Sequence, residues 1–187
     1  MSRGLIEQAL NLGLEREEIS KDHPRALIGG ERIPYPPKDL ASLTSILSRR
    51  EIKSMLALEG TTDGAVKFLE SHLQIPKVIR VPMDRSELKK TLRNMAAPVD
   101  LITLDGRGLP LDADTIWKYI EGGKSPYAKE WAKGAPVDYG IPKLKPGTFI
   151  VINLADPACK ALWFAVRSRH MLAFQSPFVG MAYTSFS

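Results

Sequence analysis

Three short apolar segments in the second half of the chain are each followed by a residue that can start a helix. The segments have the β-branched, bounded composition of buried strands and cover 77–81, 100–104 and 148–153. The possible helix caps downstream of them are Asp84, then Asp112 or Asp114, then Asp156 with Pro157 behind it. Strand followed by helix, repeated along the chain, predicts an α/β arrangement with strands beside one another.

The first half of the chain shows helical spacing instead. Apolar residues recur at helical intervals in 2–12, 40–47 and 62–73, and Ser48-Arg49-Arg50-Glu51 has the form of a capping box that would open a further helix through Leu58. We therefore expect a helix-rich half, 1–75, and a strand–helix alternating half, 76–187. At this length the two halves are expected to form a single domain, 1–187. The predicted fold class is α/β, or α+β, with a small mixed sheet surrounded by helices.

Charge and cysteine content narrow the setting of the protein. Lys and Arg number 26 against 21 Asp and Glu, a net charge of +5 that suits either an ordinary basic protein or one that binds phosphate. The one cysteine, Cys159, cannot form an intramolecular disulfide, which fits a reducing compartment. No signal peptide is visible, and the longest apolar run, 161–166, is far shorter than the ~20 residues that span a bilayer. We expect a cytoplasmic protein, with peripheral contact to the inner membrane left open.

The last part of the chain, 171–187, carries no charged residue. A disordered end would be expected to be richer in charge, so this tail is predicted to contain one or two buried strands.

Several familiar catalytic motifs are missing. Gly122-Gly123-Lys124-Ser125 ends like a P-loop, but the first glycine of that motif would fall at Lys118, so the string is better explained as a helix end. The chain has neither the Gly-x-Ser-x-Gly elbow of serine hydrolases nor the His-Glu-x-x-His zinc motif, and its histidines lack metal-ligand spacing. Hydrolysis by a catalytic triad is excluded.

The turn Asp105-Gly106-Arg107-Gly108 lies between a predicted strand and a predicted helix. Backbone N–H groups and a guanidinium in that position could bind a phosphate, which makes Gly106, Arg107 and Gly108 candidate nucleotide-binding residues. Four aspartates, at 100, 105, 112 and 114, fall within fifteen residues, and their oxygens could hold Mg²⁺ if they converge; Asp105 and Asp112 are the expected ligands. The alternative is an ordinary Asp-Gly turn followed by an aspartate cap.

Basic residues mark a candidate nucleic-acid surface. Arg85, Lys89 and Arg93 are spaced four apart, so they lie along one face of the helix predicted after Asp84. Lys77 and Arg80 stand in the strand before it. Such a stripe could neutralise successive DNA phosphates, although an ordinary solvated face has the same pattern.

Two segments resemble the ParB/sulfiredoxin superfamily. The segment 33–46 is similar to the family's proline-rich start and leucine-spaced helix, and Asp105-Gly106-Arg107-Gly108 resembles its phosphate turn. Size, charge and a helix-first layout also resemble fertility-inhibition factors of conjugative plasmids. The resemblance implies a ParB/sulfiredoxin-like fold with ATPase and DNase activities that block transfer of rival DNA through a type IV secretion system.

With that resemblance, the predicted function is that of a nucleotide- and DNA-binding protein, an ATP-linked DNase. Asp105 and Arg107 would be catalytic, ATP and Mg²⁺ the cofactors, and DNA, nucleotide and a type IV secretion component the partners. Two alternatives stay open: a non-catalytic interaction protein that docks a secretion or partition component through 171–187, and a toxin or effector.

Overall fold

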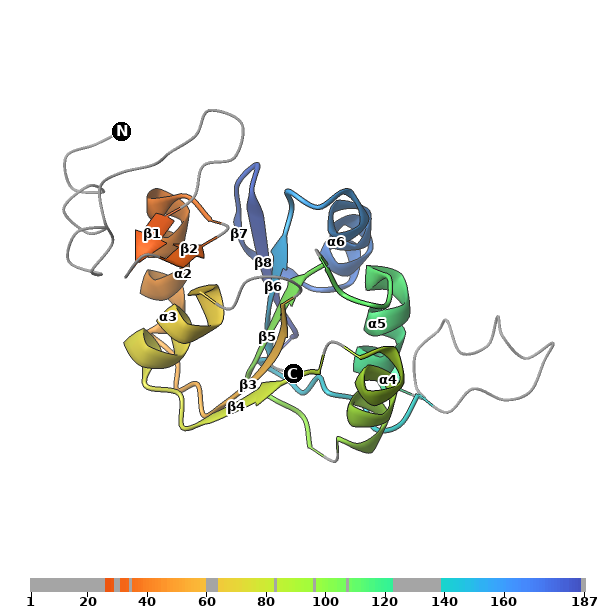
Figure 1. The fold of residues 1–187 in the computed structure, drawn as a ribbon. Coiled ribbons are helices and arrows are strands. Elements are labelled where there is room, and N and C mark those ends of the chain that lie inside the picture. The colour runs from red at the N-terminus through yellow and green to blue at the C-terminus, as the bar shows by residue number, and fades with distance from the viewer. Residues whose placement is uncertain are drawn as a thin grey trace.

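The computed structural model describes residues 26–28, 31–33, 35–59, 64–82, 84–95, 97–106, 108–122 and 139–185. Within them a mixed, six-stranded sheet is flanked by helices on both faces, and a two-stranded hairpin lies apart from that sheet (Figure 1). The predicted α/β class with a mixed sheet is therefore confirmed. The helix expected over 2–12 lies outside the described residues, and the extent of the domain, 1–187, stays a prediction.

The strands and helices alternate from β3 onward. The strands of the large sheet are β3 (Ser54–Glu59), β4 (Lys77–Arg80), β5 (Leu101–Asp105), β6 (Phe149–Asn153), β7 (Met171–Gln175) and β8 (Val179–Tyr183). The hairpin is formed by β1 (Ala26–Ile28) and β2 (Glu31–Ile33). The helices are α2 (Pro37–Leu47), α3 (Gly64–Leu73), α4 (Arg85–Asn94), α5 (Ala113–Glu121) and α6 (Pro157–Arg169).

The order of strands in the large sheet is β4-β3-β5-β6-β8-β7. The four strands from β4 to β6 are parallel, and β8 runs antiparallel to both of its neighbours. From β3 the chain passes through α3 to β4 on one side, then returns through α4 to β5 on the other side of β3. The direction of winding thus reverses between β3 and β5, which makes this place the topological switch point of the sheet.

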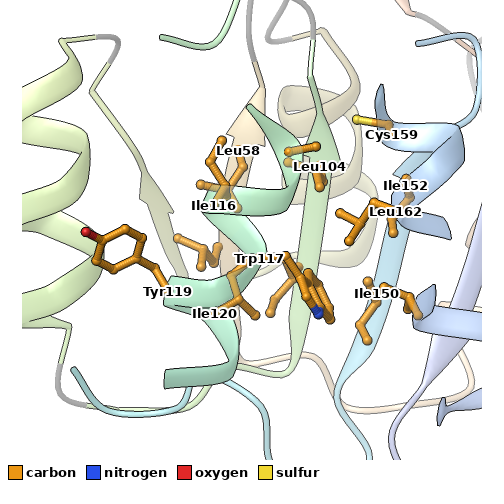
Figure 2. Packing of buried hydrophobic residues seen from close by; sticks show 14 of the residues in the cluster. Leu58, Leu104, Ile116, Trp117, Tyr119, Ile120, Ile150, Ile152, Cys159 and Leu162 are labelled. Carbon is orange, nitrogen blue, oxygen red and sulfur yellow. The ribbon is translucent and has the colours of Figure 1, made fainter. Parts of the chain in front are cut away.

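Two hydrophobic cores lie on opposite faces of the sheet. The first core joins α4, α5 and α6 to strand residues such as Leu104 and Ile150. The second core joins α2 and α3 to strand residues such as Leu101 and Val151. Successive residues of a strand point to opposite faces of the sheet. Because both faces are covered, β5 and β6 are buried along their whole length and their sequences are mostly apolar. Figure 2 shows the first core around α5, where Trp117 lies between the helix and the strands.

The helix predicted from the capping box at Ser48 through Leu58 is wrong, because this segment contains β3. Met55, Leu56 and Leu58 are wholly buried, and β3 is hydrogen-bonded to β4 on one side and to β5 on the other. These residue types are good helix formers, and a short apolar run has no period that separates helix from strand. Pairing with two strands overrides that preference.

The helix starts predicted in the second half are confirmed. Asp84 caps α4 by accepting from the backbone N–H groups of Ser86 and Glu87, at 3.0 Å each. Asp112, rather than Asp114, caps α5, and Asp156 caps α6 ahead of Pro157. Each cap satisfies amide groups that the first turn of a helix leaves unpaired.

The uncharged tail supplies β7 and β8, as predicted. Val179, Met181 and Ala182 of β8 are buried, so this strand belongs to the core of the sheet. Within 171–185, β7 is the strand with an unpaired side in the large sheet, and docking of a partner through 171–187 stays a prediction.

Candidate functional site

The carboxyl ends of parallel strands meet at one edge of a sheet, and in this chain Asp105 ends β5 at that edge. Its Cα partner in β3 is Glu59, the last residue of that strand. The Asp105 side chain is buried, and its Oδ1 accepts a 3.1 Å hydrogen bond from Nδ2 of Asn153, the last residue of β6. Asn153 is fixed in turn, because its Oδ1 accepts from the backbone N–H of Ala155 at 3.0 Å. A held, buried carboxylate thus stands at the switch point.

The residue after Asp105 is in close contact with the start of α6. A Cβ built on Gly106 would lie 2.8 Å from Sγ of Cys159 and 3.2 Å from Oδ2 of Asp156. Both distances are shorter than ordinary van der Waals contact. Glycine at position 106 is therefore what lets the turn after β5 pack against the capped end of α6.

Aspartate side chains occupy the helix starts at this edge. The caps are Asp84 on α4, Asp112 on α5 and Asp156 on α6. Hydrogen bonds from the side chain of Ser86 and the backbone of Glu87 lower the pKa of Asp84. Desolvation works against ionisation of Asp112, yet its hydrogen bonds from Thr115 leave its pKa below the ordinary value. The carboxylates of Asp84 and Asp112 are therefore ionised at neutral pH, and all three caps already accept hydrogen bonds from helix amides that a bound phosphate would need.

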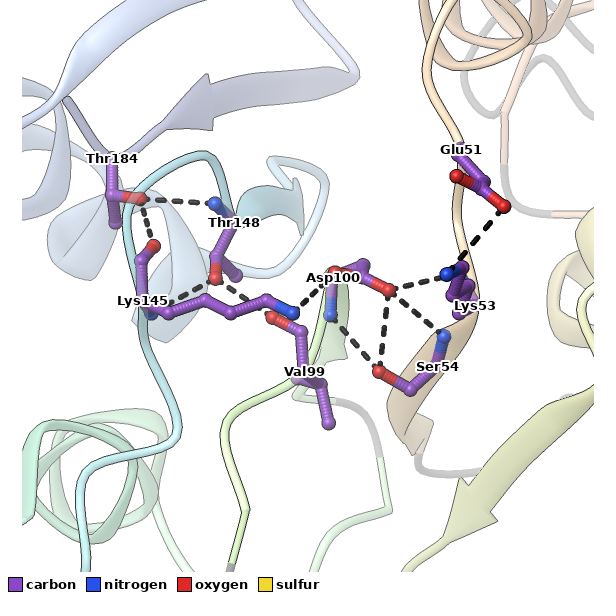
Figure 3. Close-up of polar contacts among 8 residues, drawn as sticks. All are labelled: Glu51, Lys53, Ser54, Val99, Asp100, Lys145, Thr148 and Thr184. Atoms are coloured by element: carbon purple, nitrogen blue, oxygen red, sulfur yellow. Dashed lines mark hydrogen bonds and ion pairs between the residues drawn. The ribbon is translucent and has the colours of Figure 1, made fainter. Parts of the chain in front are cut away.

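The four aspartates of the predicted metal cluster do not converge. Asp100 precedes β5 and so lies at the opposite edge of the sheet from Asp105. There it accepts from the backbone N–H of Lys53 at 2.8 Å and pairs with Nζ of Lys145 at 2.7 Å (Figure 3). Asp114 pairs with Lys118 on α5 at 3.1 Å. The described part of the chain holds no group of three or more His, Cys, Asp or Glu arranged for a metal, and Mg²⁺ binding by Asp105 and Asp112 stays a prediction.

The remaining predicted site residues fall in three places. Arg107 lies outside the described residues. Gly106 and Gly108 flank it, and Gly108 has a φ of 74°, a conformation that favours glycine. The predicted DNA-binding residues of β4 and α4 are exposed, while Leu88 and Leu92 are buried on the inner face of α4. These exposed residues are Lys77, Arg80, Arg85, Lys89 and Arg93. Arg80 pairs with Glu70 at 3.7 Å, and contact of these residues with DNA stays a prediction.

Sequence reasoning missed Asn153. The residue was visible as the end of the clearest predicted strand, but its role depends on β6 lying beside β5. Asn153 is 48 positions from Asp105, and strand order is not encoded in any local pattern.

Comparison with known proteins gives no family for this chain. No family model matches it, and no curated protein matches it. Among solved structures, it is similar to the SAH-bound methyltransferase PaMTH1 from Podospora anserina, at 9% identity and a TM-score of 0.47, over 99% of this chain and 89% of that one. It is also similar to a putative O-methyltransferase from Klebsiella pneumoniae, at 15% identity and a TM-score of 0.40, over 97% of this chain and 88% of that one. Because both scores are low, the fold assignment rests on the sheet itself.

These findings correct the ParB/sulfiredoxin prediction. No model of that superfamily matches, and the two solved structures named above are described as a methyltransferase and a putative O-methyltransferase. The helix-first layout behind the resemblance also fails, since 54–59 is a central strand. The predicted ParB/sulfiredoxin fold is therefore wrong. The function predicted from it, an ATP-linked DNase that acts in fertility inhibition of conjugative plasmids, is wrong as well. In the described residues, no helix has the length and apolar character to span a membrane.

Proposed function

We propose that this chain binds a small, phosphate-free ligand with hydroxyl or cationic groups at the carboxyl ends of β3 and β5. In open α/β sheets, ligands bind outside the carboxyl ends of the strands at the switch point. The observation that carries the proposal is the buried carboxylate of Asp105 at that point, held by Asn153.

The charges at this edge decide the class of ligand. A phosphate at this edge would be repelled by the carboxylates of Asp105, Asp112 and Asp156. It would also compete with Asp112 and Asp156 for the backbone N–H groups of the helices that they cap. A cation or a hydroxyl instead gains from a carboxylate, because the carboxylate only accepts hydrogen bonds and attracts positive charge. The edge therefore favours ammonium, sulfonium or sugar hydroxyl groups over phosphate.

Each residue of the proposed site has a distinct role. Asp105 is the acceptor for the ligand's donor group. Asn153 is a positioning residue, because its amide fixes the orientation of the Asp105 carboxylate. Gly106 keeps the turn after β5 close against Cys159 and Asp156, which sets the direction in which the strand end faces.

Calorimetric titration with two kinds of adenine compound tests the proposal. S-adenosylmethionine and S-adenosylhomocysteine carry hydroxyl and cationic groups without phosphate, whereas ATP with Mg²⁺ carries phosphate on the same base. We expect binding of at least one of the first pair and weaker binding of ATP. Asp105→Asn should lower the affinity about tenfold or more, since a charge-assisted hydrogen bond is lost.

Asp112→Asn provides the matched control. It removes a carboxylate at the same edge while asparagine still caps α5 and Asp105 is unchanged, so affinity should fall much less than in Asp105→Asn. Tighter binding of ATP than of both adenosyl compounds would overturn the proposed ligand class. Unchanged affinity in a folded Asp105→Asn variant would remove Asp105 from the site.

A further inference from the structure

The two edges of the large sheet differ in how they are protected. At one edge, β4 places exposed cations at both of its ends, Lys77 and Arg80. At the other edge, β7 has no charged residue, and none follows it to the end of the chain. Charged side chains are a common means of keeping an edge strand from pairing with another chain. The β7 edge lacks that protection.

Exposed apolar side chains gather at the unprotected edge. The described residues contain four large, well-exposed hydrophobic residues, and two of them, Met171 at 53% and Leu172 at 48%, begin β7. Leu172 pairs with Ala182, which belongs to the core beneath α6, so Leu172 faces the α6 side of the sheet. Met171, the residue before it, therefore faces the opposite side. The edge is apolar on both faces, as an internal strand is.

From this edge we infer that β7 is the contact through which two copies of the chain associate. A two-fold contact joins the same surface patch of both copies, so any charge near the axis meets its own like charge. The chain carries +5 overall, and β4 would oppose cations to cations in such a contact. The neutral β7 strand imposes no such repulsion. A second copy is therefore the partner whose chemistry the strand fits.

The geometry of β7 also indicates where the contact is centred. Its pairing with β8 shifts register between Leu172 and Phe174, and a bulge of this kind twists the strand beyond it. The first residues, Met171 and Leu172, lie before that shift and pair with Tyr183 and Ala182. Of the cations nearby in the chain, Arg169 is already paired with Glu121 at 2.5 Å, while Arg167 is exposed on α6. The pairing of two β7 strands would join the sheets across their edges.

Sedimentation velocity over a range of concentrations tests the association. We expect a dimer that dissociates on dilution, and Leu172→Lys should raise its dissociation constant about tenfold or more, because two like charges would face each other. Ile141→Lys is the comparison variant, since Ile141 is 50% exposed and lies outside β7, between Tyr139 and the start of β6. A protein that is monomeric at every concentration would overturn the inference, as would equal weakening by both variants.

A cysteine at the edge gives a second test that does not depend on the folding of the lysine variant. The native Cys159 is buried, so it gives little background. Under mild oxidation, Leu172→Cys should form a disulfide-linked dimer, and Lys77→Cys at the other edge should not. Absence of the Leu172→Cys dimer, or equal crosslinking at both edges, would contradict association through β7. Neither test involves the ligand site, so the outcomes of both tests are independent of the proposed function.

Discussion

The indole of Trp163 lies directly over the backbone of Gly180. A Cβ built on Gly180 would stand 2.6 Å from two atoms of the Trp163 ring, Cε2 and Cζ2. Gly180 belongs to β8, whose neighbours β6 and β7 hold it on both sides, so the strand has little room to move. The absence of a side chain at position 180 is what lets α6 approach the sheet.

Gly180→Ala is therefore expected to destabilise the fold by about 1–3 kcal/mol, the usual cost of overpacking a core. Urea unfolding should show a lower midpoint with an unchanged slope. Adding Trp163→Phe should recover part of the loss, because the smaller ring frees the space and Trp163 Nε1 has no hydrogen-bond partner among the described residues. Equal stability of Gly180→Ala and the unmodified protein would contradict this packing.

Gly106→Ala tests the contact between the turn after β5 and α6. The new methyl group would collide with Cys159 Sγ, so we expect a loss of about 1–3 kcal/mol in the free energy of unfolding. Cys159→Ala in the same chain should restore part of it. Since contacting residues are coupled, the double-mutant cycle should give an interaction energy well away from zero, and strict additivity would show that the two positions do not touch.

Stability is expected to fall in mild acid because of His170. Burial lowers the pKa of this histidine, the neighbouring Arg169 lowers it further, and Glu121 opposes them. The unfolded chain therefore binds a proton at a pH where the folded chain does not, so stability falls as pH drops below the ordinary histidine pKa of about 6.5. Above that pH the effect is absent.

His170→Gln should flatten the fall in melting temperature below about pH 6.5. His72 is exposed on α3, and His72→Gln is the comparison variant that removes a histidine from another part of the fold. If the two variants have the same acid profile, His170 is not the group responsible.

Local signals in the sequence were sufficient for the helix starts. Asp84, Asp112 and Asp156 each cap a helix through groups two or three residues away, so the relevant contacts are contained in the local sequence. The strands β4, β5 and β6 were likewise predicted from β-branched composition. The strand β3 was not, because Met, Leu and Ala suit either structure and only its two neighbours decide between them.

The sequence alone therefore determined the alternation of strand and helix in 76–187, the single cysteine, the neutral tail and the aspartates that cap α4, α5 and α6. Only the tertiary structure decided that β3 lies between β4 and β5, that Asp105 meets Asn153, and that Asp100 is separated from Asp105 by the length of a strand. The physical reason is range. A cap or a buried strand is set by residues within one or two turns, whereas strand order is set by packing of the whole chain, and the position of a site follows from that order.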